Sequence, residues 1–269
     1  MIRIVVNESK RALNIGFFVA MLGVVLCICF DSWNDLTMAI VNDDSPACSY
    51  YFFVNSAYGG MCRNYVLPIL ATFPFATSFC EEKHNRAVAF ISSREGVKEY
   101  GIIKYSVNAV VGGLSVALGT MMTILLLCSR FPLVSGDYNA ESVDEIFHCW
   151  IAVNNPVFYC FSEICFGFMR GMIWASIAML VSVYITDRLV ITMVPFLGKG
   201  IFVSVCQLLR IDNNHRIDML LIGRTVIKNS KFTVLIASAT ALTIALALGV
   251  VFEMMIMRGH KNGTLYQGK

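Results

Sequence analysis

The sequence predicts an all-α integral membrane protein with six transmembrane helices, and its composition gives the first two reasons. Of its 269 residues, 57% are hydrophobic and only 14% are charged, whereas soluble domains usually carry about 25% charged residues. The mean hydropathy is +0.67. Most of the surface must therefore face something other than water, and the long apolar runs indicate that this is a lipid bilayer.

The third reason is the length of those apolar runs. A helix that crosses ~30 Å of hydrocarbon needs about 20 apolar residues. We expect a single transmembrane domain over 1–269 with spans at 12–30, 56–80, 104–128, 164–186, 189–208 and 233–257. Pro68 and Pro74 should bend the second span, which a membrane tolerates because neighbouring helices can satisfy the freed carbonyls.

Small residues are frequent in two of these spans, "NAVVGGLSVALGT" in the third and "ASATALTIALALG" in the sixth. Small side chains let two helix backbones approach closely, so we expect helix–helix contacts there. Asn14 and Asn108 are candidates for hydrogen bonds between helices.

The distribution of Lys and Arg predicts the orientation. Basic residues favour cytoplasmic termini and a cytoplasmic loop over 81–103, while the first two outer loops, 31–55 and 129–163, are rich in acidic residues. The third outer loop, 209–232, disagrees because it is basic. Either 189–208 is a re-entrant hairpin and the basic segment is cytoplasmic, or that segment is an amphipathic piece on the outer leaflet.

The loop over 81–103 gathers charge in a chain that has little of it. The stretch "EEKHNRAVAFISSREGVKEYGIIKY" has helical spacing, and "SSREG" predicts a break between two short amphipathic helices. Such a pair below the membrane would suit docking of another protein. The alternative is an ordinary solvated loop.

The same region resembles a known family. The segment "LPILATFPFATSFCEEKHNRAVAFISSREGVKEYGIIKYSVNAVVGGL" is similar to the second and third spans of the permeases of ABC-2 type ABC transporters. The similar features are acidic residues at the end of the second span, an Arg-then-Tyr stretch, and a Lys that opens a Gly-rich third span. Further on, "VSVYITDRLVITMVPFL" is similar to the family's fourth and fifth spans with their tight turn and Pro-Phe.

The resemblance implies a coupling helix in the first cytoplasmic loop, docked on a separate ATP-binding cassette subunit. The ATPase-coupling residues would be Glu81, Glu82, Asn85, Arg86, Arg94, Glu95, Tyr100 and Lys104. Asp187 and Arg188 lie in the next cytoplasmic turn, where either solvation or a second ATPase contact would explain them. The resemblance also implies a second permease copy or a similar permease, contact with membrane lipid, and export of an amphipathic peptide, drug or lipid-like substrate across a bacterial cytoplasmic membrane.

No cofactor is expected on this chain, because ATP and Mg²⁺ would bind the partner subunit. A G-x-x-x-x-G-K-[ST] motif is absent from the sequence: Gly198-Lys199 is followed by Gly200. The sequence has no C-x-x-C pair and its four histidines are far apart, so no metal site is expected. A formal charge of +3 without a continuous basic patch does not favour nucleic acid as a partner.

Two other functions compete with transport. Glu81-Glu82-x-x-x-Arg86 also matches the first motif of CAAX-type intramembrane proteases, which need histidines in F-x-x-x-H and H-x-x-x-N/D arrangements. None of the four histidines has either spacing, so we do not expect an enzyme. A non-transporting immunity or sensor protein would have the same spans without a substrate path.

Ionisable residues at membrane depth are functional candidates. Lys199, Glu253, Glu163 and Arg170 are the candidates for a substrate path. Snorkelling to the inner interface would also explain Glu253, and a structural pairing or re-entrant turn would also explain Lys199. If the outside is oxidising, Cys48 and Cys62, which flank the start of the second span, are candidates for a disulfide.

Overall fold

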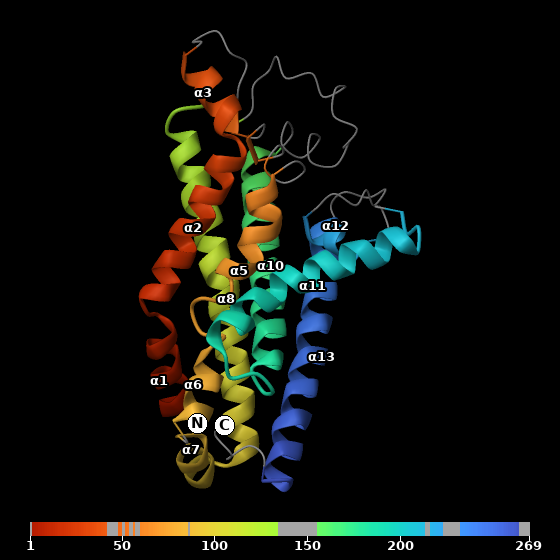
Figure 1. Ribbon diagram of the computed structural model, residues 1–269. Helices are drawn as coiled ribbons and strands as arrows, with labels where there is room; N and C mark the ends of the chain where they lie inside the picture. Colours follow the sequence, from red (N-terminus) through yellow and green to blue (C-terminus); the bar gives the residue numbers. More distant parts are fainter. Residues whose placement is uncertain are drawn as a thin grey trace.

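The structure is a computed structural model, and it describes residues 2–41, 48–49, 52–53, 56, 60–85, 87–133, 155–212, 216–222 and 232–263. These ranges contain α-helices and one short π-helix, and no strand. The helices form an elongated bundle in which α1 and the end of α13 lie at the same end (Figure 1). The chain is an all-α membrane protein, as predicted.

Helices α8 (Val97–Cys128) and α10 (Pro156–Val181) form the centre of the bundle. Small residues let them approach closely, since a Cβ atom added to Gly112 would lie 2.4 Å from the Cβ atom of Ala175. Asn108 joins the same pair, because its Nδ2 donates to the carbonyl oxygen of Ala175 at 2.7 Å. Both the expected contact and the expected interhelical hydrogen bond of Asn108 are confirmed.

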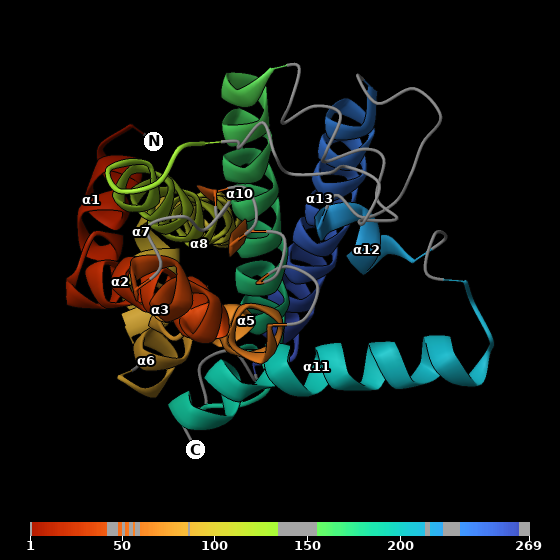
Figure 2. The same cartoon turned by 90° about the horizontal axis from the view of Figure 1, so that it is seen from above.

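Two further helices pack on opposite sides of this centre, as the view along the bundle shows (Figure 2). Helix α2 (Ile15–Asp31) packs on α8, and α13 (Thr233–Lys261) packs on both α10 and α8. The small residues predicted to make contacts in α13 do so: Ala237, Ala241 and Ala245 are buried, and the Tyr105 hydroxyl donates to the carbonyl oxygen of Ala245.

The first predicted span is a bent pair of helices. Helix α1 (Ile2–Ala12) and α2 meet at a break with an angle of 50°. Asn14 stabilises this break in two ways. Its Oδ1 accepts a hydrogen bond from the amide of Phe17 at 3.2 Å and so caps α2, while its Nδ2 donates to the carbonyl oxygen of Pro74 at 3.1 Å.

The second predicted span, 56–80, is not one continuous helix. It consists of the π-helix η1 (Cys62–Val66), α5 (Leu67–Leu70), turns over 71–77, and α6 (Ser78–His84). Pro74 lies within the turns, where its missing N–H prevents a regular helix. Pro74 therefore interrupts this segment rather than only bending it, whereas Pro68 lies in the first turn of α5. The bond from Asn14 to Pro74 places the break beside the one between α1 and α2.

Four described helices are long and apolar enough to cross a membrane: α8, α10, α11 (Arg188–Leu208) and α13. The bent α1–α2 pair would make a fifth. Two spans differ in their bounds from the sequence prediction. Helix α8 begins at Val97 rather than at residue 104, and α10 covers 156–181 rather than 164–186.

Helix α11 is one continuous helix, so a re-entrant hairpin over 189–208 is wrong. It runs across the bundle at a large angle to the other long helices, and its C-terminal half extends beyond them (Figures 1 and 2). The short α12 (Ile217–Ile222) is the described helix of the basic segment that follows.

Two short helices lie at opposite ends of the bundle (Figure 1). Helix α3 (Trp33–Val41) belongs to the loop predicted over 31–55. Helix α7 (Ala87–Glu95) belongs to the loop predicted over 81–103 and is separated from α8 by Gly96, whose φ of 87° suits glycine. The predicted break is therefore present, but the second short helix is the start of α8.

Candidate functional site

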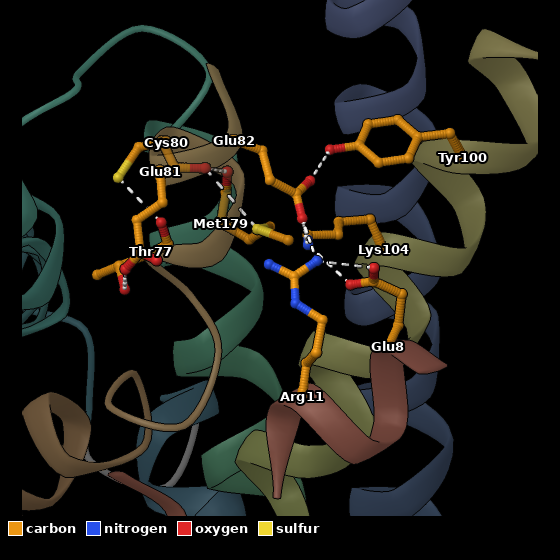
Figure 3. Close-up of polar contacts among 10 residues, drawn as sticks. Glu8, Arg11, Thr77, Cys80, Glu81, Glu82, Tyr100, Lys104 and Met179 are labelled. Carbon is orange, nitrogen blue, oxygen red and sulfur yellow. Dashed lines mark hydrogen bonds and ion pairs between the residues drawn. The ribbon is translucent and has the colours of Figure 1, made fainter. Parts of the chain in front are cut away.

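Five side chains form a polar cluster at the end of the bundle that carries α7. We call it the interior ion network, and its members are Glu8, Arg11, Glu82, Tyr100 and Lys104 (Figure 3). They come from α1, α6 and α8, so the network joins three helices. Its centre is the ammonium group of Lys104, whose Nζ lies 2.8 Å from Glu8 Oε2 and 2.8 Å from Glu82 Oε1.

The rest of the network completes the contacts of the two carboxylates. Arg11 donates to Glu8 at 3.0 Å and also to Glu82, and the Tyr100 hydroxyl donates to the other oxygen of Glu82. Hydrogen bonds from Lys104, Tyr100 and Arg11 satisfy both carboxylate oxygens of Glu82, and the positive charges of Lys104 and Arg11 offset the cost of burying it. Two cations therefore balance two carboxylates in this network.

This network corrects the predicted role of three residues. Glu82, Tyr100 and Lys104 are only 4%, 3% and 0% exposed, so they do not contribute to a docking surface. The reason is that α8 begins before Tyr100, and its first turns already pack against α1 and α6. Their chemistry is that of a structural connection between helices.

The other predicted coupling residues lie closer to the surface. Asn85, Arg94, Asp187 and Arg188 are exposed, and Glu81 is partly buried 3.5 Å from Arg188. Asp187 also caps α11, because its carboxylate accepts from the amide of Leu189 at 2.8 Å. The side chains of Arg86 and Glu95 lie outside the described part of the structure.

Glu81 and Glu82 do not form a paired catalytic site. Glu82 points to Lys104, while Glu81 accepts a hydrogen bond from Thr77 on another side of α6 (Figure 3). Over the described ranges, no group of three or more His, Cys, Asp and Glu side chains could hold a metal ion. This geometry opposes the protease alternative.

The four substrate-path candidates lie in two places. Glu253 is 3.5 Å from Lys98 near the α7 end of the bundle, and 24% of its side chain is exposed. Glu163 is buried elsewhere, 2.7 Å from Arg63 Nη2. The seven-residue spacing of Glu163 and Arg170 does not make them an ion pair.

Arg170 and Lys199 share a second polar site with Arg63. We call these three residues the buried cation cluster; they are 2% (Arg63), 6% (Arg170) and 8% (Lys199) exposed. Arg170 is repelled by Arg63 and attracted by Glu163, and Lys199 is repelled by Arg170 and attracted by Asp218. Arg63 was not among the predicted site residues, although its charge within the predicted span 56–80 made it a functional candidate.

Asp31 connects Arg63 to the end of α2. Its carboxylate accepts hydrogen bonds from the amides of Cys62 and Arg63 at 2.9 and 2.7 Å. Cys48 and Cys62 are free thiols, so the structure does not contain the predicted disulfide.

Comparison with known proteins does not assign the chain to a family. No family model, no curated protein and no solved structure matches it.

Proposed function

We propose that this chain is the transmembrane permease subunit of an ABC-2 type transporter. It would couple ATP hydrolysis by a separate ATP-binding subunit to the export of an amphipathic substrate, such as a peptide, a drug or a lipid-like molecule. The basis is the resemblance of the second to fifth predicted spans, and the structural observation that carries the proposal is the position and surface of α7.

Helix α7 has one face on the bundle and one face outside it. Val88 and Ser92 are buried at 1% and 4% exposure, whereas Phe90 is 78% exposed and Arg94 is also exposed. Exposed aromatic and arginine side chains are the residue types that most often anchor protein interfaces. The helix thus presents a short apolar and basic surface that suits a groove on a partner subunit.

The interior ion network gives a route from this surface into the bundle. Helix α6 precedes α7 directly, and Glu82 of α6 is held by Lys104 of α8 and Arg11 of α1. A rigid-body displacement of α6 and α7 by a partner would therefore be transmitted to α8 through a buried ion pair and to α1 through a half-exposed one.

A permease of this type would also have a defined topology and defined partners. Six membrane crossings would include the bent α1–α2 pair, the broken segment from η1 to α6, and α11. Both termini would be cytoplasmic, ATP and Mg²⁺ would bind the partner, and a second permease copy would complete the transporter in a bacterial cytoplasmic membrane. The chain itself would not be an enzyme.

Affinity purification from the native membrane in mild detergent tests the proposal. We expect a soluble chain with a P-loop to co-purify stoichiometrically with the wild type, as identified by mass spectrometry. The double variant Phe90→Ala, Arg94→Glu should lose this chain. A matched charge reversal, Arg130→Glu, changes an exposed arginine just after the opposite end of α8 and should retain it.

The two failures would have different meanings. A wild-type preparation without any P-loop chain would contradict the transporter proposal and favour a non-transporting immunity or sensor protein. Retention of the P-loop chain by the α7 variant would leave the transporter in place and show that α7 is not its docking surface.

A further inference from the structure

Among the described residues, the buried cation cluster of Arg63, Arg170 and Lys199 has fewer carboxylates than cations. Glu163 pairs with Arg63 at 2.7 Å. Within the described ranges, no carboxylate forms an ion pair with Arg170 or Lys199. Buried cations in a membrane protein normally pair with anions or carbonyls, because burial removes the hydration of the charge.

The hydrogen bonds of the cluster are also incomplete. The guanidinium of Arg170 donates from Nε to its own helix, at the carbonyl oxygen of Phe166, over a long 3.3 Å. Lys199 Nζ donates to the neutral oxygens of Asn64, at 2.6 Å to the carbonyl and 3.2 Å to Oδ1. The buried Nε of Arg63 has no hydrogen-bond partner in the described structure. Several N–H donors are therefore available to an acceptor that the described residues do not supply.

The nearby charged residues reduce the excess of positive charge at this site but do not remove it. Arg216 binds its neighbour Asp218 through two contacts, at 3.0 and 2.7 Å. Asp31 accepts from the backbone amide of Arg63. With these groups included, the described cations still exceed the described carboxylates by one. For the described residues, a single additional negative charge would balance the site.

An apolar groove lies beside Lys199, from which it is separated by the ring of Tyr65. It has a volume of about 590 Å³ and is lined by Tyr65 and by one face of α11, including Phe196, Ile201 and Leu208. Lys199 Nζ lies 5.4 Å from the centroid of the Tyr65 ring. The same ring therefore contacts the groove and the cation cluster.

We infer that this site binds an anionic amphiphile. Its phosphate or carboxylate group accepts hydrogen bonds from Arg170 and Lys199, and its apolar chain lies in the groove along α11. A planar guanidinium suits bidentate binding of either oxyanion, and the ammonium group adds a second charge. The inference does not require transport, since a lipid of the surrounding bilayer is one source of such a ligand and an exported substrate is another.

Binding to the purified chain without any ATPase tests this inference. Decyl phosphate, decanol and inorganic phosphate are titrated against the chain in a zwitterionic detergent and read by native mass spectrometry. Decyl phosphate should bind most tightly, because decanol lacks the charge and inorganic phosphate lacks the chain. Replacing Arg170 and Lys199 by Gln should weaken decyl phosphate binding by about tenfold or more, as expected for loss of charged hydrogen bonds.

Two control variants separate binding from folding. The conservative variant Lys199→Arg keeps the charge and should retain binding, and Arg188→Gln removes an exposed cation at the start of α11 and should leave binding unchanged. If the wild type binds decanol as tightly as decyl phosphate, the inference is wrong whether or not the variants fold. If inorganic phosphate binds as tightly as decyl phosphate, the groove does not bind an apolar chain, and that part of the inference is wrong. Because no ATPase is present, none of these outcomes depends on the proposed function.

A second measurement distinguishes the source of the ligand. The chain is reconstituted in vesicles of phosphatidylcholine with a minor fraction of phosphatidylglycerol, re-extracted, and analysed for bound lipid. Enrichment of phosphatidylglycerol on the wild type and its loss in the double Gln variant would identify a bilayer lipid as the occupant. Tight decyl phosphate binding without this enrichment would identify a ligand other than the bilayer lipid.

Discussion

Lys104 and Lys98 lie on the same helix and both contact a glutamate, but in different surroundings. Lys104 is fully buried between Glu8 and Glu82, whereas the side chain of Lys98 is 67% exposed beside Glu253. Removing one member of a buried ion pair leaves an uncompensated charge, which typically costs about 3–5 kcal/mol. An exposed pair contributes between about 0 and 1 kcal/mol.

We therefore expect Lys104→Met to reduce the free energy of unfolding by several times more than Lys98→Met. The measurement is denaturant unfolding of both variants in the same detergent, followed by far-UV circular dichroism. Adding Glu82→Gln to Lys104→Met should recover part of the loss because it removes one of the unpaired charges. Similar losses for the two lysine variants would show that the network does not stabilise the fold.

At this scale the sequence predicted the residue types better than their roles. The resemblance to ABC-2 permeases implied that Glu82, Tyr100 and Lys104 contact an ATPase, whereas in the structure they form a buried network with one another. Their inward direction depends on contacts with Glu8 and Arg11 of α1, which are far away in the sequence. The spacing of residues within 81–104 cannot show that these side chains contact α1.

At the scale of helices, the contact between α8 and α10 depends on glycine residues, which have no side chain and let the two backbones approach closely. Gly112→Ala would place a Cβ atom 2.4 Å from that of Ala175, while a Cβ atom on Gly198 of α11 would meet nothing within 4 Å. Overpacking of a close contact typically costs about 1–3 kcal/mol, and Gly→Ala in an open helix position typically gains about 0.5–1 kcal/mol.

We accordingly expect the two Gly→Ala variants to change stability in opposite directions. Gly112→Ala should lower the melting temperature in detergent, and Gly198→Ala should raise it slightly, as followed by intrinsic fluorescence or circular dichroism. A melting temperature for Gly112→Ala at or above the wild-type value would contradict the close contact.

Helices with long apolar runs were predictable, and interrupted ones were not. The apolar runs of α8, α10, α11 and α13 give their existence and approximate bounds, because burial in lipid needs only length and composition. The prolines predicted a bend in the second span, but not that a hydrogen bond from Asn14 to Pro74, sixty residues away, would join this interruption to the one after Ala12. Composition therefore indicated two spans where the structure has two broken segments.

For the whole molecule, the arrangement predicts which lysines share one side of the membrane. Lys10 belongs to α1, Lys98 to the first turn of α8 and Lys261 to the end of α13, and all three are exposed. Helix α1, the start of α8 and the end of α13 lie at the α7 end of the bundle (Figure 1). In sealed vesicles of one orientation they should react together, or be protected together, with a membrane-impermeant amine reagent. Lys104 and Lys199 serve as internal controls, because both are buried and should stay unmodified. Peptide mass spectrometry reads all five, and reaction of one exposed lysine without the other two would contradict the bundle topology.

The adjacent interruptions in the first and second crossing segments have a mechanical consequence. Asn14 links the two unwound stretches, and Gly16 leaves room for the carbonyl of Phe73, to which an added Cβ would come within 2.8 Å. On the α7 side of the two interruptions, Arg11 of α1 forms an ion pair with Glu82 of α6. Helices α1 and α6 are therefore joined at their interrupted ends by Asn14 and beyond them by Arg11, and Lys104 ties both to α8, so a tilt of either helix would strain the contacts of the other.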